Sequence, residues 1–357
     1  MNQGKKKICF PSVGNYYPAF KTLLGLFGCE IIKMPPYSRK TVEIGSKYSP
    51  ESICYPYKFF LGNYIEALDL GANIIVAIGG GCRLGYYAEA HGEVLKDLGY
   101  KFQIINFSKI DNPTLFGQMK AINPRLTNYR LVRGLNLAYR KAKVIEKLEK
   151  FIRLNIGFEV TSGELEKLFD RSLVEMEATN SALGLKLLEL KYIIKINAVP
   201  IKKPRDIIRV GLVGDLYTLM EPFSNFYIEK KLGQKGIEVH RFVAITNLFN
   251  ELFVKRFVVK KWLRDAWPYI KYDLGARSSD TVAVAQKLAK DGFDGLIHIK
   301  PAGCMPEINA MSALHNISRD YKIPIIYFSF DTQTSETGIN TRLEAFYDML
   351  VMKKRKK

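Results

Sequence analysis

Apolar and polar residues alternate along the first third of the chain in a way that predicts short strands joined by helices. The expected strands lie at 7–10, 30–34, 73–78 and 102–105, and the expected helices lie at 17–27, 58–69 and 87–98. The run at 73–78 is apolar throughout, as in a strand that is buried on both faces of a parallel sheet. We therefore expect residues 1–111 to form a β/α domain.

Longer amphipathic patterns follow between residues 112 and 205, with stretches at 130–152 and 164–195, and they predict a helical bridging region. The alternation of strands and helices then resumes, so we expect residues 206–357 to form a second β/α domain that ends in a helix. The predicted fold class is α/β, with two parallel-sheet domains and a helical insertion between them.

The second β/α domain repeats a segment of the first. Residues 69–82 align with residues 291–304, and each segment contains a helix end, an apolar strand and a Gly-containing loop with one cysteine. These cysteines are Cys82 and Cys304. Open α/β sheets bind ligands beyond the carboxyl ends of their strands, so we expect both thiols at such edges, facing one cleft.

Three of the five cysteines lie in loops that suit metal ligation: Cys54, Cys82 and Cys304. Cys54 precedes a predicted helix, whose positive end lowers the pKa of a nearby thiol. It lies 28 residues before Cys82, and the position 28 residues before Cys304 is occupied by Ala276. The second domain therefore offers no fourth thiol, and the predicted site has three sulfur ligands and one open position.

Two metal centres are compatible with three thiolates and an open position. A 4Fe–4S cluster normally takes four thiolates, so three leave one iron open to water, hydroxide or a substrate oxygen. Zinc with three thiolates and a water is the main alternative. We favour the cluster, because ligands from separate domains suit a centre that is exposed in a cleft. Gly81 and Gly303 fit this interpretation, since glycines let backbone amides approach sulfur.

Other residues of the same loops are candidates for the cleft. Arg83, Tyr86 and Glu307 each lie within a few residues of a predicted ligand, at the start of a predicted helix. Glu307 has a second interpretation as a carboxylate that interacts with the helix dipole. His298 lies in the strand before Cys304, and we expect a core histidine with a partner.

Composition narrows the class of protein further. The odd number of sparsely placed cysteines fits reduced thiols in a cytoplasmic protein, with Cys9 and Cys29 as small buried residues. No apolar run approaches the roughly 20 residues that a membrane span needs. The formal net charge of +19 predicts an anionic partner. Nucleic acid is disfavoured because the basic residues form no aromatic-interleaved tract, whereas an acidic electron donor or the phosphates of coenzyme A fit.

Four stretches around these residues carry a resemblance to a known family: Pro50–Lys58, Gly81–Tyr87, Pro301–Glu307 and Thr341–Phe346. They resemble the 2-hydroxyacyl-CoA dehydratase and benzoyl-CoA reductase superfamily, specifically its activase-related (CoA protein activase) branch, over nearly the whole chain. The resemblance implies two flavodoxin-like (Rossmann-like) domains that hold a 4Fe–4S cluster, with Cys54, Cys82 and Cys304 as its ligands.

The resemblance also implies a partner and a reaction class. Catalytic subunits of the family receive an electron from a separate ATP-hydrolysing iron–sulfur activator protein, and this chain, which has no P-loop, would be such an acceptor. It would work anaerobically as a lyase that dehydrates a CoA thioester by radical chemistry, or as an oxidoreductase of a small molecule. Related chains carry Glu-His where this one has Thr332-Gln333, so we assign that loop no proton transfer.

Two alternatives stay open at this point. The first concerns function, because a non-catalytic iron–sulfur electron-transfer or scaffold subunit would need the same three ligands. The second concerns assembly, because a homodimer and a heterodimer both agree with the sequence.

Overall fold

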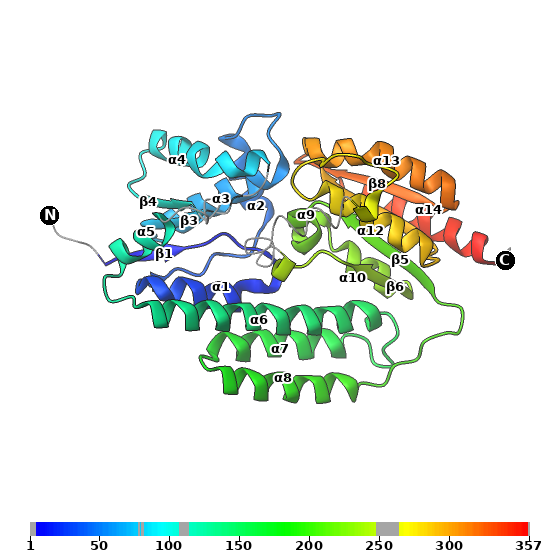
Figure 1. The fold of residues 1–357 in the computed structure, drawn as a ribbon, viewed down its shortest axis with the longest axis horizontal. Helices are drawn as coiled ribbons and strands as arrows, with labels where there is room; N and C mark the ends of the chain where they lie inside the picture. The colour runs from blue at the N-terminus through cyan, green and yellow to red at the C-terminus, as the bar shows by residue number, and fades with distance from the viewer. Residues whose placement is uncertain (1–4, 78, 80–81, 107–113, 248–263, 356–357) are drawn as a thin grey trace. The chain divides into compact units, whose positions relative to one another are not determined.

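Two four-stranded parallel β-sheets organise the structure (Figure 1). The computed structural model describes residues 5–77, 79, 82–106, 114–247 and 264–355. The strands of the first sheet are β1 (Lys7–Cys9), β2 (Glu30–Ile31), β3 (Ile74–Ala77) and β4 (Gln103–Asn106). Those of the second sheet are β5 (Ile208–Gly214), β6 (Ile237–Arg241), β7 (Gly295–Pro301) and β8 (Ile325–Phe330).

The two sheets share one topology. The first has the order β2-β1-β3-β4 and the second has the order β6-β5-β7-β8, so each strand of one sheet has a counterpart in the other. This order, with the first strand between the second and the third, is that of flavodoxin-like doubly wound folds. Strands β3 and β7 are buried throughout, as expected for strands covered on both faces. The prediction of an α/β fold with two flavodoxin-like parallel-sheet domains is confirmed.

Five helices accompany the first sheet: α1 (Tyr17–Leu24), α2 (Arg39–Lys47), α3 (Tyr55–Asp69), α4 (Tyr87–Asp97) and α5 (Thr114–Ile122). The helix predicted at 17–27 continues past α1 as a short 3₁₀ turn and ends at Gly28, whose φ of 66° suits glycine. The helix predicted at 58–69 begins three residues earlier, directly after Cys54. Helix α2 is an addition that the apolar pattern does not predict.

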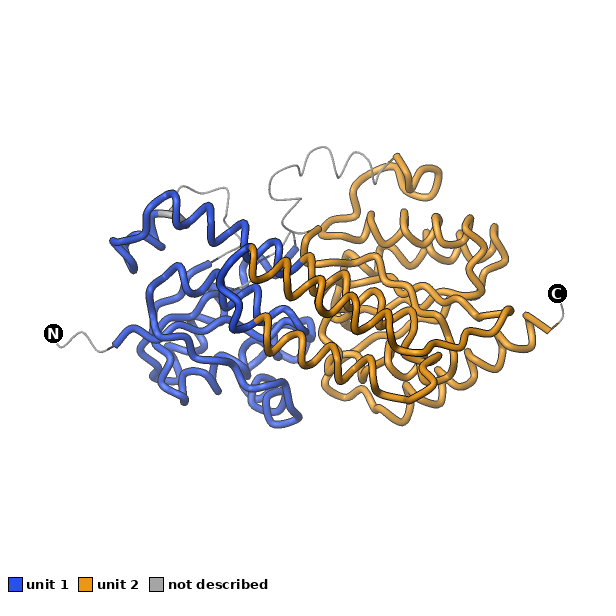
Figure 2. Tube along the Cα trace, turned by 90° about the horizontal axis from the view of Figure 1, so that it is seen from below, with its two compact units in different colours: residues 1–142, 177–182 blue, residues 143–176, 183–357 orange. Residues whose placement is uncertain are grey.

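The described residues form two compact units (Figure 2). Unit 1 comprises residues 1–142 and 177–182, and unit 2 comprises residues 143–176 and 183–357. Three long helices, α6 (Asn128–Asn155), α7 (Glu164–Ala178) and α8 (Ala182–Asn197), occupy the predicted bridging region and contribute residues to both units. The domain bounds predicted at 111 and 205 stay predictions.

The single stretch predicted at 164–195 is wrong, because residues 179–181 separate α7 from α8. These three residues are Thr, Asn and Ser, whose short polar side chains bond to nearby backbone groups and compete with helical hydrogen bonds. The apolar period alone does not reveal this break. The basic helix predicted at 130–152 is confirmed as α6.

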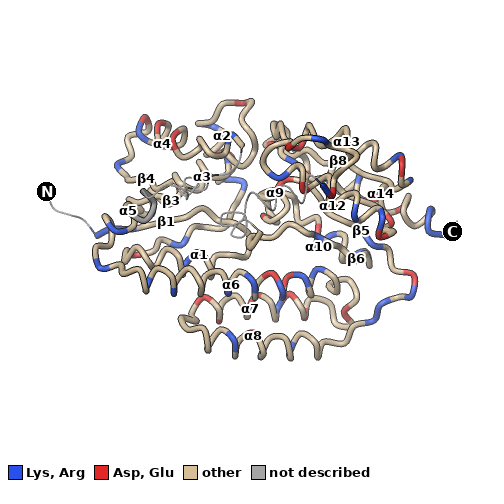
Figure 3. The backbone as a smooth tube through the Cα atoms, viewed as in Figure 1, with Lys and Arg blue, Asp and Glu red and all other residues tan. Residues whose placement is uncertain are grey.

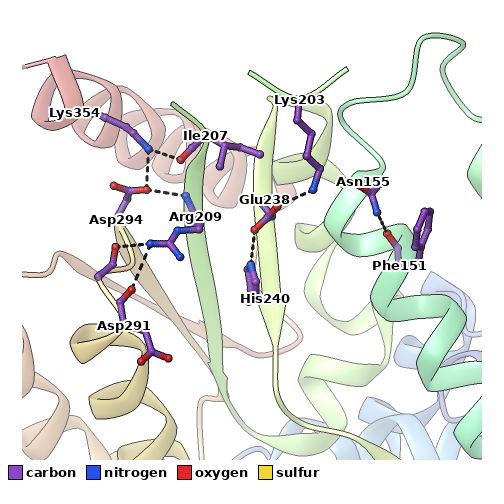
Figure 4. A network of polar contacts seen from close by, with 11 residues as sticks. Phe151, Asn155, Lys203, Ile207, Arg209, Glu238, His240, Asp291, Asp294 and Lys354 are labelled. Carbon is purple, nitrogen blue, oxygen red and sulfur yellow. Dashed lines mark hydrogen bonds and ion pairs between the residues drawn. The ribbon is translucent and has the colours of Figure 1, made fainter. Parts of the chain in front are cut away.

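The helices of the second sheet are α9 (Leu216–Met220), α10 (Ile228–Gln234), α12 (Ser278–Lys290), α13 (Met305–Tyr321) and α14 (Glu336–Arg355). Polar side chains fix the amino ends of the strands in this sheet (Figure 4). The Asp294 carboxylate accepts hydrogen bonds from the backbone N–H of Arg209 at 2.8 Å and from the Lys354 ammonium at 3.3 Å. Lys354 also donates to the carbonyl of Ile207. Helix α14 is thereby joined to β5 and to the start of β7, opposite the edge where the strands end.

Two glycines allow α2 and α3 to cross with their backbones in contact. A Cβ atom on Gly62 would overlap the carbonyl oxygen of Thr41, and one on Gly45 would overlap the carbonyl oxygen of Lys58. Only glycine fits at either position, because the obstructing atoms belong to the backbone of the other helix. This crossing fixes α3, and with it Cys54 at the start of that helix.

We predict that Gly62→Ala lowers the free energy of unfolding by about 1–3 kcal/mol, because the added methyl group must push the two helices apart. Gly92→Ala is the matched control, since a Cβ atom at this position of α4 meets nothing within 4 Å. The control should raise the free energy of unfolding by about 0.5–1 kcal/mol through helix propensity. Urea unfolding compares the two variants, and effects of the same sign would contradict the close crossing.

Candidate functional site

Cys54 lies at the carboxyl edge of the first sheet. Four residues separate the end of helix α3 from the start of β3, so the helix runs antiparallel to β3 and starts at that edge. Cys54 is its N-cap residue, with φ −65° and ψ 149°, and the thiol makes no capping hydrogen bond. Pro56 occupies the first turn, where its missing N–H is harmless. The sulfur is therefore placed at the positive end of a 15-residue helix.

A buried tyrosine of unit 1 contacts Cys54 and lies near Cys82. The Oη atom of Tyr87 lies 2.6 Å from the Sγ atom of Cys54. Burial raises the pKa of Tyr87, the sulfurs of Cys54 and Cys82 raise it further, and Arg83 opposes the shift. The Cys82 sulfur is thus near enough for its charge to act on the hydroxyl group that contacts Cys54, although 28 residues separate the two cysteines in the sequence.

Aromatic packing holds this hydroxyl group in place. Tyr87 is 4% exposed at the start of α4, and its ring packs edge-on against Tyr57 of α3 with centroids 4.8 Å apart. His91, one turn further along α4, stacks on the same Tyr57 ring at 4.0 Å, and its Nε2 atom lies 3.0 Å from the Tyr57 carbonyl oxygen. Burial lowers the pKa of His91 to about 3, so this contact is made by the neutral ring. Helices α3 and α4 are thereby fixed to each other.

The predicted cleft residues of unit 1 have different positions. Arg83 is exposed in a 3₁₀ turn before α4 and lies close enough to Tyr87 to affect its pKa. Tyr86 is 75% exposed, whereas its neighbour Tyr87 is the residue that contacts Cys54. Gly81 lies outside the described residues. Sequence reasoning missed Tyr87 because a Tyr-Tyr pair does not show which ring faces the interior; the phase of the helix decides that.

Cys304 has the corresponding place in unit 2. It follows β7, the counterpart of β3, and it is the N-cap residue of α13 with φ −79° and ψ 94°. As at Cys54, its thiol makes no capping hydrogen bond and a proline, Pro306, lies in the first turn of the helix. Gly303 is exposed directly before it. Both N-cap cysteines therefore start their helices with the same Cys-X-Pro sequence.

Unit 2 has an arginine where unit 1 has Cys54. Helix α12 leads into β7 as α3 leads into β3, and its N-cap residue is Arg277, whose guanidinium lies 2.5 Å from the Asp280 carboxylate. The position expected from the cysteine spacing is Ala276, the residue directly before this N-cap. A charged pair thus replaces the thiol at this helix start.

Glu307 lies in the interior and not in an open cleft. It is 2% exposed in the first turn of α13, and its Oε1 atom accepts hydrogen bonds from the hydroxyls of Ser278 at 3.1 Å and Thr281 at 3.0 Å. Its Oε2 atom lies 2.8 Å from Nε2 of His298, which is fully buried in β7. The carboxylate therefore joins α12, α13 and β7. The prediction of His298 as a core histidine with a partner is confirmed.

The two remaining cysteines, Cys9 and Cys29, differ in burial. Cys9 is fully buried in β1, and burial raises the pKa of its thiol to about 12. Cys29 is half-buried before β2, and its sulfur lies 3.5 Å from the carbonyl oxygen of Phe27. All five cysteines belong to the described residues, and none of them forms a disulfide.

Comparisons with known proteins assign no family: no protein-family model matches the chain, and no curated protein matches it. Within the described ranges, no helix has both the length and the apolar character that crossing a membrane requires.

Among the residues with described positions, no three His, Cys, Asp or Glu side chains are grouped as ligands of one metal ion. The residue types of the pair in unit 1 suit a soft metal, because Cys54 and Cys82 are two half-buried thiols at the carboxyl edge of one sheet and both act on the Tyr87 hydroxyl. The third predicted ligand belongs to the other unit.

We predict that Glu307→Ala lowers the free energy of unfolding by about 2–4 kcal/mol, because it leaves two buried hydroxyls and a buried imidazole without their acceptor. Glu344→Ala is the control on α14, since that carboxylate is 55% exposed in its ion pair with Lys235. It should change stability by about 0.5 kcal/mol or less. Urea unfolding measures both, and a Glu307→Ala protein as stable as the control would show that the buried contacts contribute nothing.

Proposed function

We propose that this chain is an iron–sulfur protein in which Cys54, Cys82 and Cys304 ligate a 4Fe–4S cluster. The observation that carries the proposal is the Tyr87 hydroxyl, which contacts the Cys54 sulfur at 2.6 Å and lies within the electrostatic range of Cys82. Core packing does not require two half-buried thiols at one sheet edge, whereas a thiophilic centre does. Cys304 is the corresponding thiol of unit 2, at the end of the equivalent strand.

The surroundings of the thiols suit their proposed role. Cys54 and Cys304 both lie at helix N-termini, where the helix dipole favours the thiolate form. The Tyr87 hydroxyl is placed to donate a hydrogen bond to the Cys54 sulfur, and such donors tune the electronic properties of sulfur ligands. Arg83 adds a positive charge nearby. Each of these groups stabilises negative charge on sulfur.

When bound, a cluster with three protein thiolates supplies low-potential one-electron chemistry and an iron that can accept a further ligand. The helix starts position the three thiolates, and Tyr87 and Arg83 contribute to the electrostatic potential around them. By the resemblance of its sequence, the proposed reaction is radical dehydration of a CoA thioester or reduction of a small molecule. A reducing, cytoplasmic setting belongs to the proposal, in keeping with the absence of disulfides among the five cysteines.

The proposed electron donor is an ATP-hydrolysing activator protein, and a basic face on α6 supports docking of an acidic partner. Lys and Arg residues occur along this helix (Figure 3). Arg133, Arg140, Lys143, Lys147 and Lys150 are exposed at intervals of three to seven residues, which places them along one side of the helix. Lys141, by contrast, is buried and donates to the carbonyl of Pro18 at 3.4 Å, so it is not part of this surface.

Anaerobic metal and sulfide analysis tests the proposal. The wild-type protein should be brown, with about four irons and four acid-labile sulfides per chain. Cys54→Ala, Cys82→Ala and Cys304→Ala should each lose most of the iron and sulfide, because three ligands leave no redundancy. Cys29→Ala is the matched control, a half-buried cysteine outside the proposed ligand set, and it should keep the full content.

Two other outcomes would distinguish the cluster from zinc and the enzyme from a non-catalytic subunit. A colourless protein with stoichiometric zinc would contradict the cluster. A brown protein that binds the activator but catalyses nothing with activator, ATP and reductant would support the non-catalytic electron-transfer alternative, whereas turnover of a CoA thioester would support the enzyme.

A further inference from the structure

A buried lysine lies next to Cys304 at the carboxyl end of β7. Lys300 is 4% exposed, and it shares one face of the strand with His298, two residues before it. The Glu307 contacts described above place α12 and α13 over this face. The ammonium group is therefore enclosed by the elements that position Cys304.

The ammonium has few partners for a buried charge. In the described part of the chain, Lys300 forms no ion pair, and its hydrogen bonds reach only the carbonyl oxygens of Pro301 and Ala302, both at 3.5 Å. These distances are at the outer limit for a hydrogen bond. Pro301 is the last residue of β7 and Ala302 begins the short loop that leads to Cys304, so the ammonium lies beside the start of this loop.

Two carboxylates of unit 2, Glu307 and Asp215, accept hydrogen bonds from groups other than Lys300. Glu307 binds Ser278, Thr281 and His298 through its two oxygens. Asp215, at the end of β5, accepts hydrogen bonds from the backbone N–H of Thr218 at 2.9 Å and from its hydroxyl at 2.7 Å. Neither carboxylate forms an ion pair with Lys300 that would neutralise it.

A buried charge without a counter-charge is unfavourable, and such groups are normally paired or bound to an ion. Burial lowers the pKa of Lys300, whereas the Cys304 sulfur and the Glu307 carboxylate raise it. The N-terminus of α13 adds a second positive potential at the same place. Two positive sources that converge on one thiol indicate that negative charge is bound there.

We propose that Lys300 is the charge-compensating residue for an anionic centre bound at Cys304. The inference rests on the proposed function, in which that centre is a cluster whose sulfides and thiolates carry the negative charge. A fixed positive charge beside it favours the more negative, reduced form and so raises the reduction potential. Lys300 would thus make the cluster an easier acceptor of the activator's electron, without being a ligand.

The first experiment tests the uncompensated charge in the metal-free full-length protein. Lys300→Met and Lys300→Gln should unfold at a higher urea concentration than wild type, because they remove a buried ammonium whose contacts are weak. Lys287→Met on α12 is the control, since its ammonium is 61% exposed in an ion pair with Asp291, and it should leave the midpoint unchanged. Unfolding of the Lys300 variants at lower urea would show that the ammonium is already well compensated, and would overturn the inference.

The second experiment measures the midpoint potential of the reconstituted cluster by anaerobic titration followed by electron paramagnetic resonance. Lys300→Met and Lys300→Gln should keep the iron and sulfide content but shift the potential to more negative values, while Lys300→Arg and Lys287→Met should stay near wild type. An unchanged potential at full cluster content would overturn the role of Lys300 and leave the proposed function intact. A wild-type protein that takes up no cluster would instead refute the proposed function, and this inference with it.

Discussion

All strands of a parallel sheet end at the same edge, and the candidate site depends on this constraint. In unit 1, Cys82 follows the end of β3, and α3 must start at this edge because it leads back to the amino end of β3. Both thiols can lie near Tyr87 because strand ends and helix starts gather at this one edge of the sheet. In unit 2 the same strand order puts Cys304 and Arg277 at the corresponding positions.

One buried polar residue supports the edge of each sheet. In unit 1 the Tyr87 hydroxyl links the first turn of α4 to the start of α3, and the aromatic contacts of Tyr57 and His91 hold it. In unit 2 the Glu307 carboxylate joins the starts of α12 and α13 to β7. A buried polar group is stable only when its partners have the right geometry, so these contacts tie the helix starts to specific positions. Rigid helix starts are what a preorganised ligand set requires.

Positive charge is the common property of the thiol surroundings. Cys54 and Cys304 are the N-cap residues of helices, where the helix dipole is positive. Arg83 lies near Cys54 and Cys82, and Lys300 is enclosed near Cys304. The formal charge of +19 by itself predicts that the protein binds an anionic partner, but it does not say where on the surface. The structure separates exposed basic residues, such as those along α6, from the Lys300 ammonium, which is buried where negative charge is expected. The first group suits docking, and the second suits control of an electron-accepting centre.

The sequence alone was sufficient for the fold class and for the repeated strand–loop–cysteine segment, whereas Cys29, predicted to be buried, is half-buried like the three loop cysteines. These features are local, because strand and helix periods, glycine-containing loops and the burial of apolar runs depend on residues that are close in sequence. The burial of Glu307, the choice of Tyr87 over Tyr86 and the enclosure of Lys300 were decided by the tertiary structure. Helix phase and contacts between residues far apart in sequence determine which side chains face inward, and a single sequence does not state those contacts.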